Sequence, residues 1–246
     1  MDSSNSNQWL IFDVWGDYAH FKKFYTTASP LTFSIPPRTA LIGLVSAILG
    51  YPKDSYFEKM LTRKAKFAIR ILNQIKKTRL IINFINTKDN FWTPARTPHH
   101  EPRTQYIIEF LKDPRYRIYF LHEERQVHNS FKEMLINHKS FYTPYLGITE
   151  LIANFEFIGE TETEEEIESS LEQLEICSAI PIDQNFKIEF ESDKKYFKEK
   201  IPIEMTNDRI VTNYREVLFE ASGKTIRAKK DNLIKLKNGD CIAILK

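Results

Sequence analysis

The chain has 246 residues, of which 42% are hydrophobic and 28% are charged. This is the composition of a globular protein, and it excludes a chain that is disordered throughout. The two cysteines are far apart and form no CxxC pair, so we expect no disulfide framework, no metal site and no cofactor. The polar N-terminus lacks the features of a secretory signal, and the longest apolar run, residues 40–49, is too short to span a bilayer. We therefore expect a soluble, cytoplasmic protein without membrane segments.

The net charge of +2 hides an uneven distribution along the chain. Residues 1–150 carry 21 Lys and Arg against 13 Asp and Glu, whereas residues 151–246 carry 14 against 20. The basic excess is concentrated in residues 63–125. A basic sector beside an acidic one is typical of a protein that contacts a polyanion on one side and a basic protein on the other.

The first part of the chain is expected to contain three strands and one helix. Residues 8–14 (QWLIFDV) are aromatic and β-branched, which predicts a strand. A double proline then ends any strand, and residues 39–49 predict a helix that is apolar nearly all round and therefore packs beneath a sheet. Residues 66–72 alternate apolar and polar side chains, and residues 79–86 predict a further strand, so we expect these two to form a hairpin.

An insertion is predicted next, at residues 88–124. Its first part, residues 91–105, has a proline at every fourth position, which forbids a helix and favours a stiff, extended arm. Its second part, residues 106–121, predicts a hairpin that turns at residues 112–115. The insertion is therefore expected to protrude from the domain.

The elements that follow complete an α+β fold. Residues 125–138 have apolar side chains at helical spacing, and residues 151–158 predict a strand. Without the insertion, the order is strand, helix, strand, strand, helix, strand. This is the ferredoxin-like βαββαβ arrangement, which RNA-recognition modules (RRM) also use. We assign residues 1–159 to this domain.

The chain beyond this domain is expected to form a linker and a second region, both suited to protein partners. Residues 160–175 contain eight glutamates, which predicts a solvated acidic linker. Residues 176–246 predict a small β-rich C-terminal region. Its strands are expected at residues 186–190, 210–219, 225–228 and 241–245.

Residues 17–25 (DYAHFKKFY) interleave aromatic and basic side chains. Surfaces of this kind bind single-stranded RNA, because rings stack on bases and lysines neutralise phosphates. An edge strand with one solvated face has the same pattern. The candidate RNA-binding residues in this stretch are Tyr18, His20, Lys22, Lys23 and Tyr25.

Two further basic features are candidates for phosphate contact. Arg38 lies where the first helix begins, so its charge and the free N–H groups of the first turn are expected to face a phosphate together. The alternative is an exposed arginine at a helix start. The extended arm carries Arg96, His99, His100 and Arg103, which either lie across a polynucleotide backbone or belong to an ordinary surface loop. The two histidines have no HxxxH or HxxE partner, so we do not expect them to bind a metal.

Catalysis without a metal would need a base for the RNA 2′-hydroxyl and an acid for the leaving oxygen. Tyr18, His20 and Lys22, or the pair His99 and His100, have suitable side chains. No pattern in the sequence indicates that these side chains converge, and the alternative is that the histidines contact RNA or lie at the surface. We therefore expect no catalytic residue.

The stretch from Tyr25 to Gly50, YTTASPLTFSIPPRTALIGLVSAILG, resembles the opening of the Cas-five family, CRISPR-associated proteins of the RAMP superfamily. These proteins have a similar strand, an IPPRT corner and a helix that ends in AILG. Three later stretches resemble the same family, especially its type I-B branch. They are EFLKDPRYRIYF (109–120), PYLGITELIANFEFIG (144–159) and IPIEMTNDRIVTNYREVLFE (201–220).

This resemblance implies a subunit of Cascade, the type I CRISPR surveillance complex of antiviral defence. Members of the family hold the 5′ handle of the CRISPR RNA (crRNA), cap one end of the complex, and contact its backbone subunit and its large subunit. Target DNA is then met only indirectly, through the complex. The RAMP core is ferredoxin-like, with a hairpin thumb that reaches over the RNA. In type I-C the family member itself cuts precursor RNA, whereas in type I-B a separate endonuclease does so.

By position, the resemblance extends RNA contact to residues 18–23, to Arg38, and to Arg96 and Arg103 in the arm. Gly147 matches a RAMP-type glycine loop that approaches a backbone closely, and an ordinary turn is the alternative. We therefore predict a non-catalytic ribonucleoprotein subunit that binds crRNA. The alternatives are a metal-independent endoribonuclease that processes precursor crRNA and a general binder of single-stranded RNA.

Overall fold

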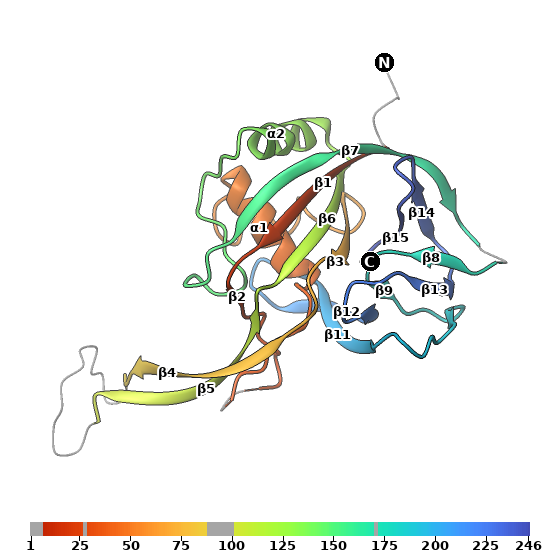
Figure 1. Cartoon of the computed structure of the whole chain (residues 1–246). Coiled ribbons are helices and arrows are strands. Elements are labelled where there is room, and N and C mark those ends of the chain that lie inside the picture. The colour runs from red at the N-terminus through yellow and green to blue at the C-terminus, as the bar shows by residue number, and fades with distance from the viewer. Residues whose placement is uncertain (1–6, 27–28, 88–100, 170–171) are drawn as a thin grey trace.

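The computed structural model describes residues 7–26, 29–87, 101–169 and 172–246. Figure 1 shows a curved sheet with two helices on one side, C-terminal strands on the other, and a two-stranded projection that extends away from the body. The mixed α+β class is therefore confirmed.

A six-stranded sheet forms the centre of the molecule, in the order β15–β14–β7–β1–β6–β3. Every neighbouring pair in it is antiparallel. The strands are β1 (Gln8–Trp15), β3 (Ala65–Ile71), β6 (Arg115–His122), β7 (Asn154–Ile167), β14 (Leu233–Leu236) and β15 (Cys241–Ala243). The predicted strands at residues 8–14 and 66–72 are thus confirmed within one residue at each end. The strand predicted at residues 151–158 exists as β7, but it starts at Asn154 and continues to Ile167.

Both helices of the described residues, α1 (Arg38–Leu49) and α2 (Arg125–Ile136), cover one face of this sheet. α1 starts directly after the double proline and stops at Gly50, whose φ of 81° ends the helix. Apolar side chains of both helices join the main core, where Phe12 of β1 meets Phe131 of α2 edge to face, with ring centroids 5.3 Å apart. Within the described ranges, no helix is long and apolar enough to cross a membrane.

The C-terminal part of the chain packs on the opposite face of the sheet and against α1. Trp9 and Tyr119, which point away from the helices, pack with Cys177 and Ile242. Two small sheets complete this part, with the orders β10–β13–β8 and β11–β12–β9. The strands are β8 (Leu174–Ile176), β9 (Ile180–Pro181), β10 (Lys187–Ile188), β11 (Tyr196–Met205), β12 (Val211–Glu220) and β13 (Ile226–Lys229).

The strands predicted at residues 210–219, 225–228 and 241–245 are confirmed, and the one at 186–190 is reduced to β10. β8, β9, β11 and β14 were not predicted. Because β14 and β15 pair into the six-stranded sheet, the C-terminal region shares its main sheet with the first part of the chain.

The projection in Figure 1, which we call the thumb, is a hairpin of β4 (Lys77–Ile85) and β5 (Arg103–Lys112). The short strand β2 (Tyr18–Ala19) pairs with the base of β5. The thumb thus begins at residue 77, and its predicted bounds, residues 88–124, are wrong.

The two hairpins predicted around the thumb are wrong as well. β3 pairs with β6, not with β4, and β5 pairs with β4, not with β6. The reason is burial. β6 is apolar enough to lie in the centre of the main sheet, whereas β4 is exposed along nearly its whole length. Apolar alternation alone does not separate these two environments, because β4 carries as many large apolar side chains as a core strand.

The acidic linker predicted at residues 160–175 is also wrong, because β7 continues to Ile167. Lysines from neighbouring elements neutralise its glutamates. The pairs are Lys132–Glu160, Lys237–Glu162, Lys235–Glu164 and Lys66–Glu166. Ion pairs of this kind offset the repulsion between neighbouring glutamates, so an acidic segment can form a strand.

Candidate RNA-binding surface

The predicted aromatic and basic stretch runs along the base of the thumb. β2 covers only its first residues, and Lys22 continues the extended chain through a bridge to Thr32. Lys22 is exposed, and Phe24 and Tyr25 are 56% and 62% exposed. Ala19, His20 and Phe21 are all buried, so this part of the stretch does not have one buried and one solvated face.

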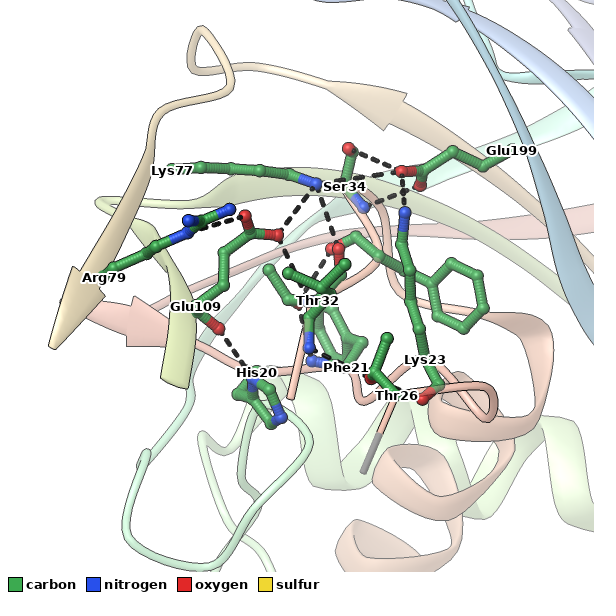
Figure 2. A network of polar contacts seen from close by, with 12 residues as sticks. His20, Phe21, Lys23, Thr26, Thr32, Ser34, Lys77, Arg79, Glu109 and Glu199 are labelled. Carbon is green, nitrogen blue, oxygen red and sulfur yellow. Dashed lines mark hydrogen bonds and ion pairs between the residues drawn. The ribbon is translucent and has the colours of Figure 1, made fainter. Parts of the chain in front are cut away.

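His20 connects the thumb to the body. Its Nδ1 lies 2.7 Å from the backbone oxygen of Glu109 in β5, and because a carbonyl only accepts, Nδ1 is the donor. Burial lowers the pKa of His20, although this hydrogen bond raises it. The ring is therefore neutral near pH 7. Figure 2 shows its second nitrogen directed away from Glu109.

A network of polar contacts, drawn in Figure 2, surrounds Lys23. The Nζ of Lys23 lies 2.9 Å from Oε1 of Glu199 in β11, and Glu199 also accepts hydrogen bonds from the backbone N–H and the hydroxyl of Ser34. Burial alone would lower the pKa of Lys23, but the hydrogen bond and charge of Glu199 raise it. Lys23 is therefore held within the protein, whereas Lys22 is free to meet a ligand.

Lys77 joins this network to the thumb. Its Nζ donates to the backbone oxygen of Thr32 at 3.0 Å and lies 3.4 Å from Glu109 and 3.8 Å from Glu199. Arg79 lies 3.9 Å from the other oxygen of Glu109 and keeps most of its side chain in solvent. These contacts hold the base of β4 and β5 against residues 32–34 and β11, and so fix the direction of the thumb.

A pocket of about 410 Å³ opens beside His20, between α1, the loop at residues 145–148 and the ends of β11 and β12. Aromatic and aliphatic side chains form most of its wall. Its polar side chains include His20, Lys22, Thr39 and Arg209, and none of the described residues that line it is acidic. Volume and lining are those of a site for a small molecule or for one unit of a polymer.

Aromatic rings from distant parts of the sequence meet at the pocket entrance. Phe24 lies 5.1 Å, ring centroid to centroid, from Tyr25 and also from Tyr214 of β12. The Nζ of Lys200 lies 5.6 Å from the Tyr214 centroid, which is within the range of a cation–π contact. The sequence prediction missed Tyr214, Lys200 and Arg209, because their distance along the chain gives no local pattern that links them to residues 18–25.

Gly147 forms part of the pocket wall and packs directly against His20. Its φ is 98°, and a Cβ placed there would lie 2.0 Å from the His20 backbone oxygen. The glycine is therefore required by a close approach to the backbone of this chain itself. The structure thus brings together His20, Lys22 and Gly147, three of the predicted residues.

Arg38 does not belong to this surface, and its predicted role in phosphate binding is wrong. Its side chain is fully buried, and its terminal nitrogens donate to the backbone oxygens of Met60, Ala65 and Ile203 at 2.6, 2.8 and 3.2 Å. Burial lowers its pKa to about 10, so it is still charged at neutral pH. The guanidinium joins the start of α1 to β3 and β11.

The predicted residues of the arm are only partly described. Arg103 is exposed at the start of β5, where it extends the basic side chains of the thumb. Arg96, His99 and His100 lie outside the described residues. Within the described part of the chain, no group of three or more His, Cys, Asp or Glu side chains is arranged to hold a metal ion.

Several of the solved structures that match this chain are described as CRISPR proteins or complexes. A crystal structure of a CRISPR protein from Archaeoglobus fulgidus is 12% identical, with a TM-score of 0.57, and the match covers 97% of this chain and 99% of that one. A crystal structure described as a Cas protein is 13% identical, with a TM-score of 0.50 and coverages of 87% and 95%. A chain of a CRISPR RNA-guided surveillance complex is 12% identical, with a TM-score of 0.49 and coverages of 89% and 91%. No curated protein matches significantly.

The sheet, the two helices and the projecting thumb place this chain in a class of α+β folds found among CRISPR proteins. The sequence itself gives the narrower assignment. Residues 9–218 match the model of the family described as CRISPR-associated protein (Cas_Cas5), so the chain belongs to that family.

Proposed function

We propose that this protein is a non-catalytic subunit of a type I Cascade complex, of subtype I-B, that binds the 5′ handle of crRNA and caps one end of the complex. Family membership over residues 9–218 carries this proposal. In the cytoplasm it would contact the backbone subunit and the large subunit, and target DNA only through the complex.

The arrangement of the core supports the proposal. The four strands β7–β1–β6–β3, with α1 after β1 and α2 after β6, follow the order expected of a ferredoxin-like RAMP domain. The thumb leaves this core between β3 and β6, close to the stretch 18–25. An RNA strand at the base of the thumb would meet the exposed side chains of Lys22 and Arg79. A strand that continued along the hairpin would reach Arg103, which pairs with Ile85 at the other end of β4 and β5.

Binding and cleavage can be measured together. Labelled handle RNA and labelled repeat RNA from the same locus are incubated with the full chain in EDTA, over a range of salt concentrations. We expect the handle RNA to be retained uncut, with an affinity that falls as salt rises. Lys22→Ala should reduce the slope of log affinity against log salt by about 0.7, the contribution of one phosphate contact to a single strand.

Lys198→Ala is the matched control, since Lys198 is an exposed lysine of β11 that pairs with Glu216. It should leave the slope unchanged. Equal affinity for handle and scrambled RNA would contradict handle recognition and indicate a general RNA binder.

An endoribonuclease that processes precursor crRNA is the second candidate, and one observation favours it. Burial lowers the pKa of His20, and its Nδ1–H donates a hydrogen bond to the backbone oxygen of Glu109. Its other ring nitrogen, Nε2, is therefore able to accept a proton at the pocket, which Lys22 also lines. In the same incubation, a discrete cut of the repeat RNA that His20→Ala abolishes would establish this activity. Uncut repeat RNA would exclude it.

A further inference from the structure

We propose that the pocket beside His20 binds a single unstacked nucleobase of the RNA, so that one position of the bound strand is splayed out of the stack. This inference rests on the proposed function, because it assumes that RNA lies across the base of the thumb.

The size and the shape of the pocket suit one base. The volume of about 410 Å³ lies in the lower part of the range for ligand sites, enough for one nucleotide and too small for a stacked run of bases. The floor is apolar, with Phe33 and Phe57 buried beneath it and Leu44 of α1 beside them. A flat, largely apolar ring would displace water from this floor, as an extended phosphate backbone would not.

The rings at the entrance are placed for stacking. Phe24 is more than half exposed although it contacts Tyr214, so one side of this pair is open to solvent. Tyr145 is 42% exposed on the loop across the pocket. Base–aromatic stacking is a main source of affinity in single-strand recognition, and exposed rings around a concave site are its usual form.

The charges around the pocket match the same occupant. Lys22 is exposed at its edge, and Arg209 keeps 55% of its side chain exposed although its Nε is 2.8 Å from Asp54. None of the described residues that line the pocket is acidic, and Asp54 beside it is paired with Arg209, so the phosphates on either side of an inserted base would be close to Lys22 and Arg209. Among the described residues, the hydroxyls of Thr39 and Tyr56 have no hydrogen-bond partner, so both can bond to the edge of a base.

An abasic scan tests this inference. Handle RNAs that each carry one abasic nucleotide are bound to the full chain, and the affinity is measured at each position. The pocket predicts that one position loses about 5- to 100-fold in affinity, the range for one stacked base, while its neighbours change little. A 2-aminopurine placed at that position should change its fluorescence on binding, because stacking on a ring quenches it.

Phe24→Leu removes an exposed ring with little risk to folding, and Tyr214→Leu is the second variant. Either should reduce the affinity for intact RNA and abolish the penalty of the sensitive abasic position. Phe190→Leu is the matched control, since Phe190 is 69% exposed and is not part of the pocket. It should behave as the unmodified chain.

Equal losses at all positions, or a penalty that survives both variants, would overturn the inference while RNA binding itself stands. Absence of RNA binding at low salt would overturn the proposed function together with it. The two failures are therefore distinguishable in one titration.

Discussion

On folding, the guanidinium of Arg38 loses its hydrogen bonds to water and donates instead to three backbone oxygens, which belong to three different segments. It also lies over the ring of Phe67, 5.5 Å from the centroid. A buried charge with several acceptors costs desolvation energy, and its removal leaves those acceptors unpaired. The arginine of the IPPRT corner therefore holds three segments of the core together. This explains why a single arginine stands at the start of an apolar helix.

Arg38→Ala should destabilise the protein by about 3 kcal/mol, because three carbonyl groups lose their donor in a dry environment. Urea unfolding followed by circular dichroism measures the change. The folded fraction should bind RNA with unchanged affinity.

Arg125→Ala is the control, since Arg125 is exposed at the start of α2. Its unfolding midpoint should stay close to that of the unmodified chain. If Arg38→Ala kept full stability but bound RNA weakly, the result would favour the original prediction that Arg38 contacts an RNA phosphate.

At the scale of elements, the thumb is a hairpin whose free strand has apolar side chains on both faces. Ile81 is 64% exposed on one face, and Leu80 and Phe84 are more than a third exposed on the other. An isolated hairpin of this kind is marginally stable. Its direction therefore depends on the contacts at its base, where Lys77 lies close to both Glu109 and Glu199.

Glu199→Gln should loosen the thumb, because the neutral amide no longer attracts Lys23 and Lys77. We expect a loss of about 1–3 kcal/mol in global stability, since Glu199 is largely buried. Hydrogen exchange of the β4 and β5 amides should accelerate beyond that of the main sheet.

Glu216→Gln is the comparison, because Glu216 forms an exposed pair with Lys198 on the neighbouring strand. Such a pair contributes about 1 kcal/mol or less. Equal exchange rates in the two variants would show that the thumb does not depend on Glu199.

At the scale of the whole molecule, two buried histidines couple stability to pH. Burial lowers the pKa of His20 and of His128 below the ordinary value of about 6.5. The ionisable groups that face them are Lys22 and Glu109 for His20, and Glu160, Lys132 and His122 for His128. Between the ordinary and the lowered pKa, the unfolded chain binds more protons than the folded one, so stability rises with pH there.

The free energy of unfolding should therefore fall as pH is lowered from 7.5 to 5.5. Replacing the buried histidine of α2, in His128→Asn, should make this fall smaller. His138→Asn changes an exposed histidine and should leave the pH dependence as it is. The measurement is the midpoint of urea unfolding at the two pH values. If the free energy of unfolding of His128→Asn fell as much between pH 7.5 and 5.5 as that of the unmodified chain, His128 would not be a source of the pH dependence.

The sequence by itself determined the main strands, both helices, the presence of an insertion and the family. These follow from local pattern, such as the apolar run after the double proline, and from a motif that spans few residues. It also pointed to His20 and Lys22, because the aromatic and basic pattern of residues 17–25 is visible in one stretch, and to Gly147 through the resemblance to the family's glycine loop.

Only the tertiary structure decided which strands pair and which charges are free. β4 and β6 have similar apolar patterns, and burial alone assigns one to the thumb and the other to the main sheet. The sequence alone predicts that Arg38 and Lys23 are surface cations. The structure shows that Arg38 donates to the backbone oxygen of Ile203 and that Lys23 pairs with Glu199. Side-chain pattern specifies local structure, whereas the partner of a charge or a strand is supplied by another part of the chain, which for Lys23 and Glu199 is 176 positions away.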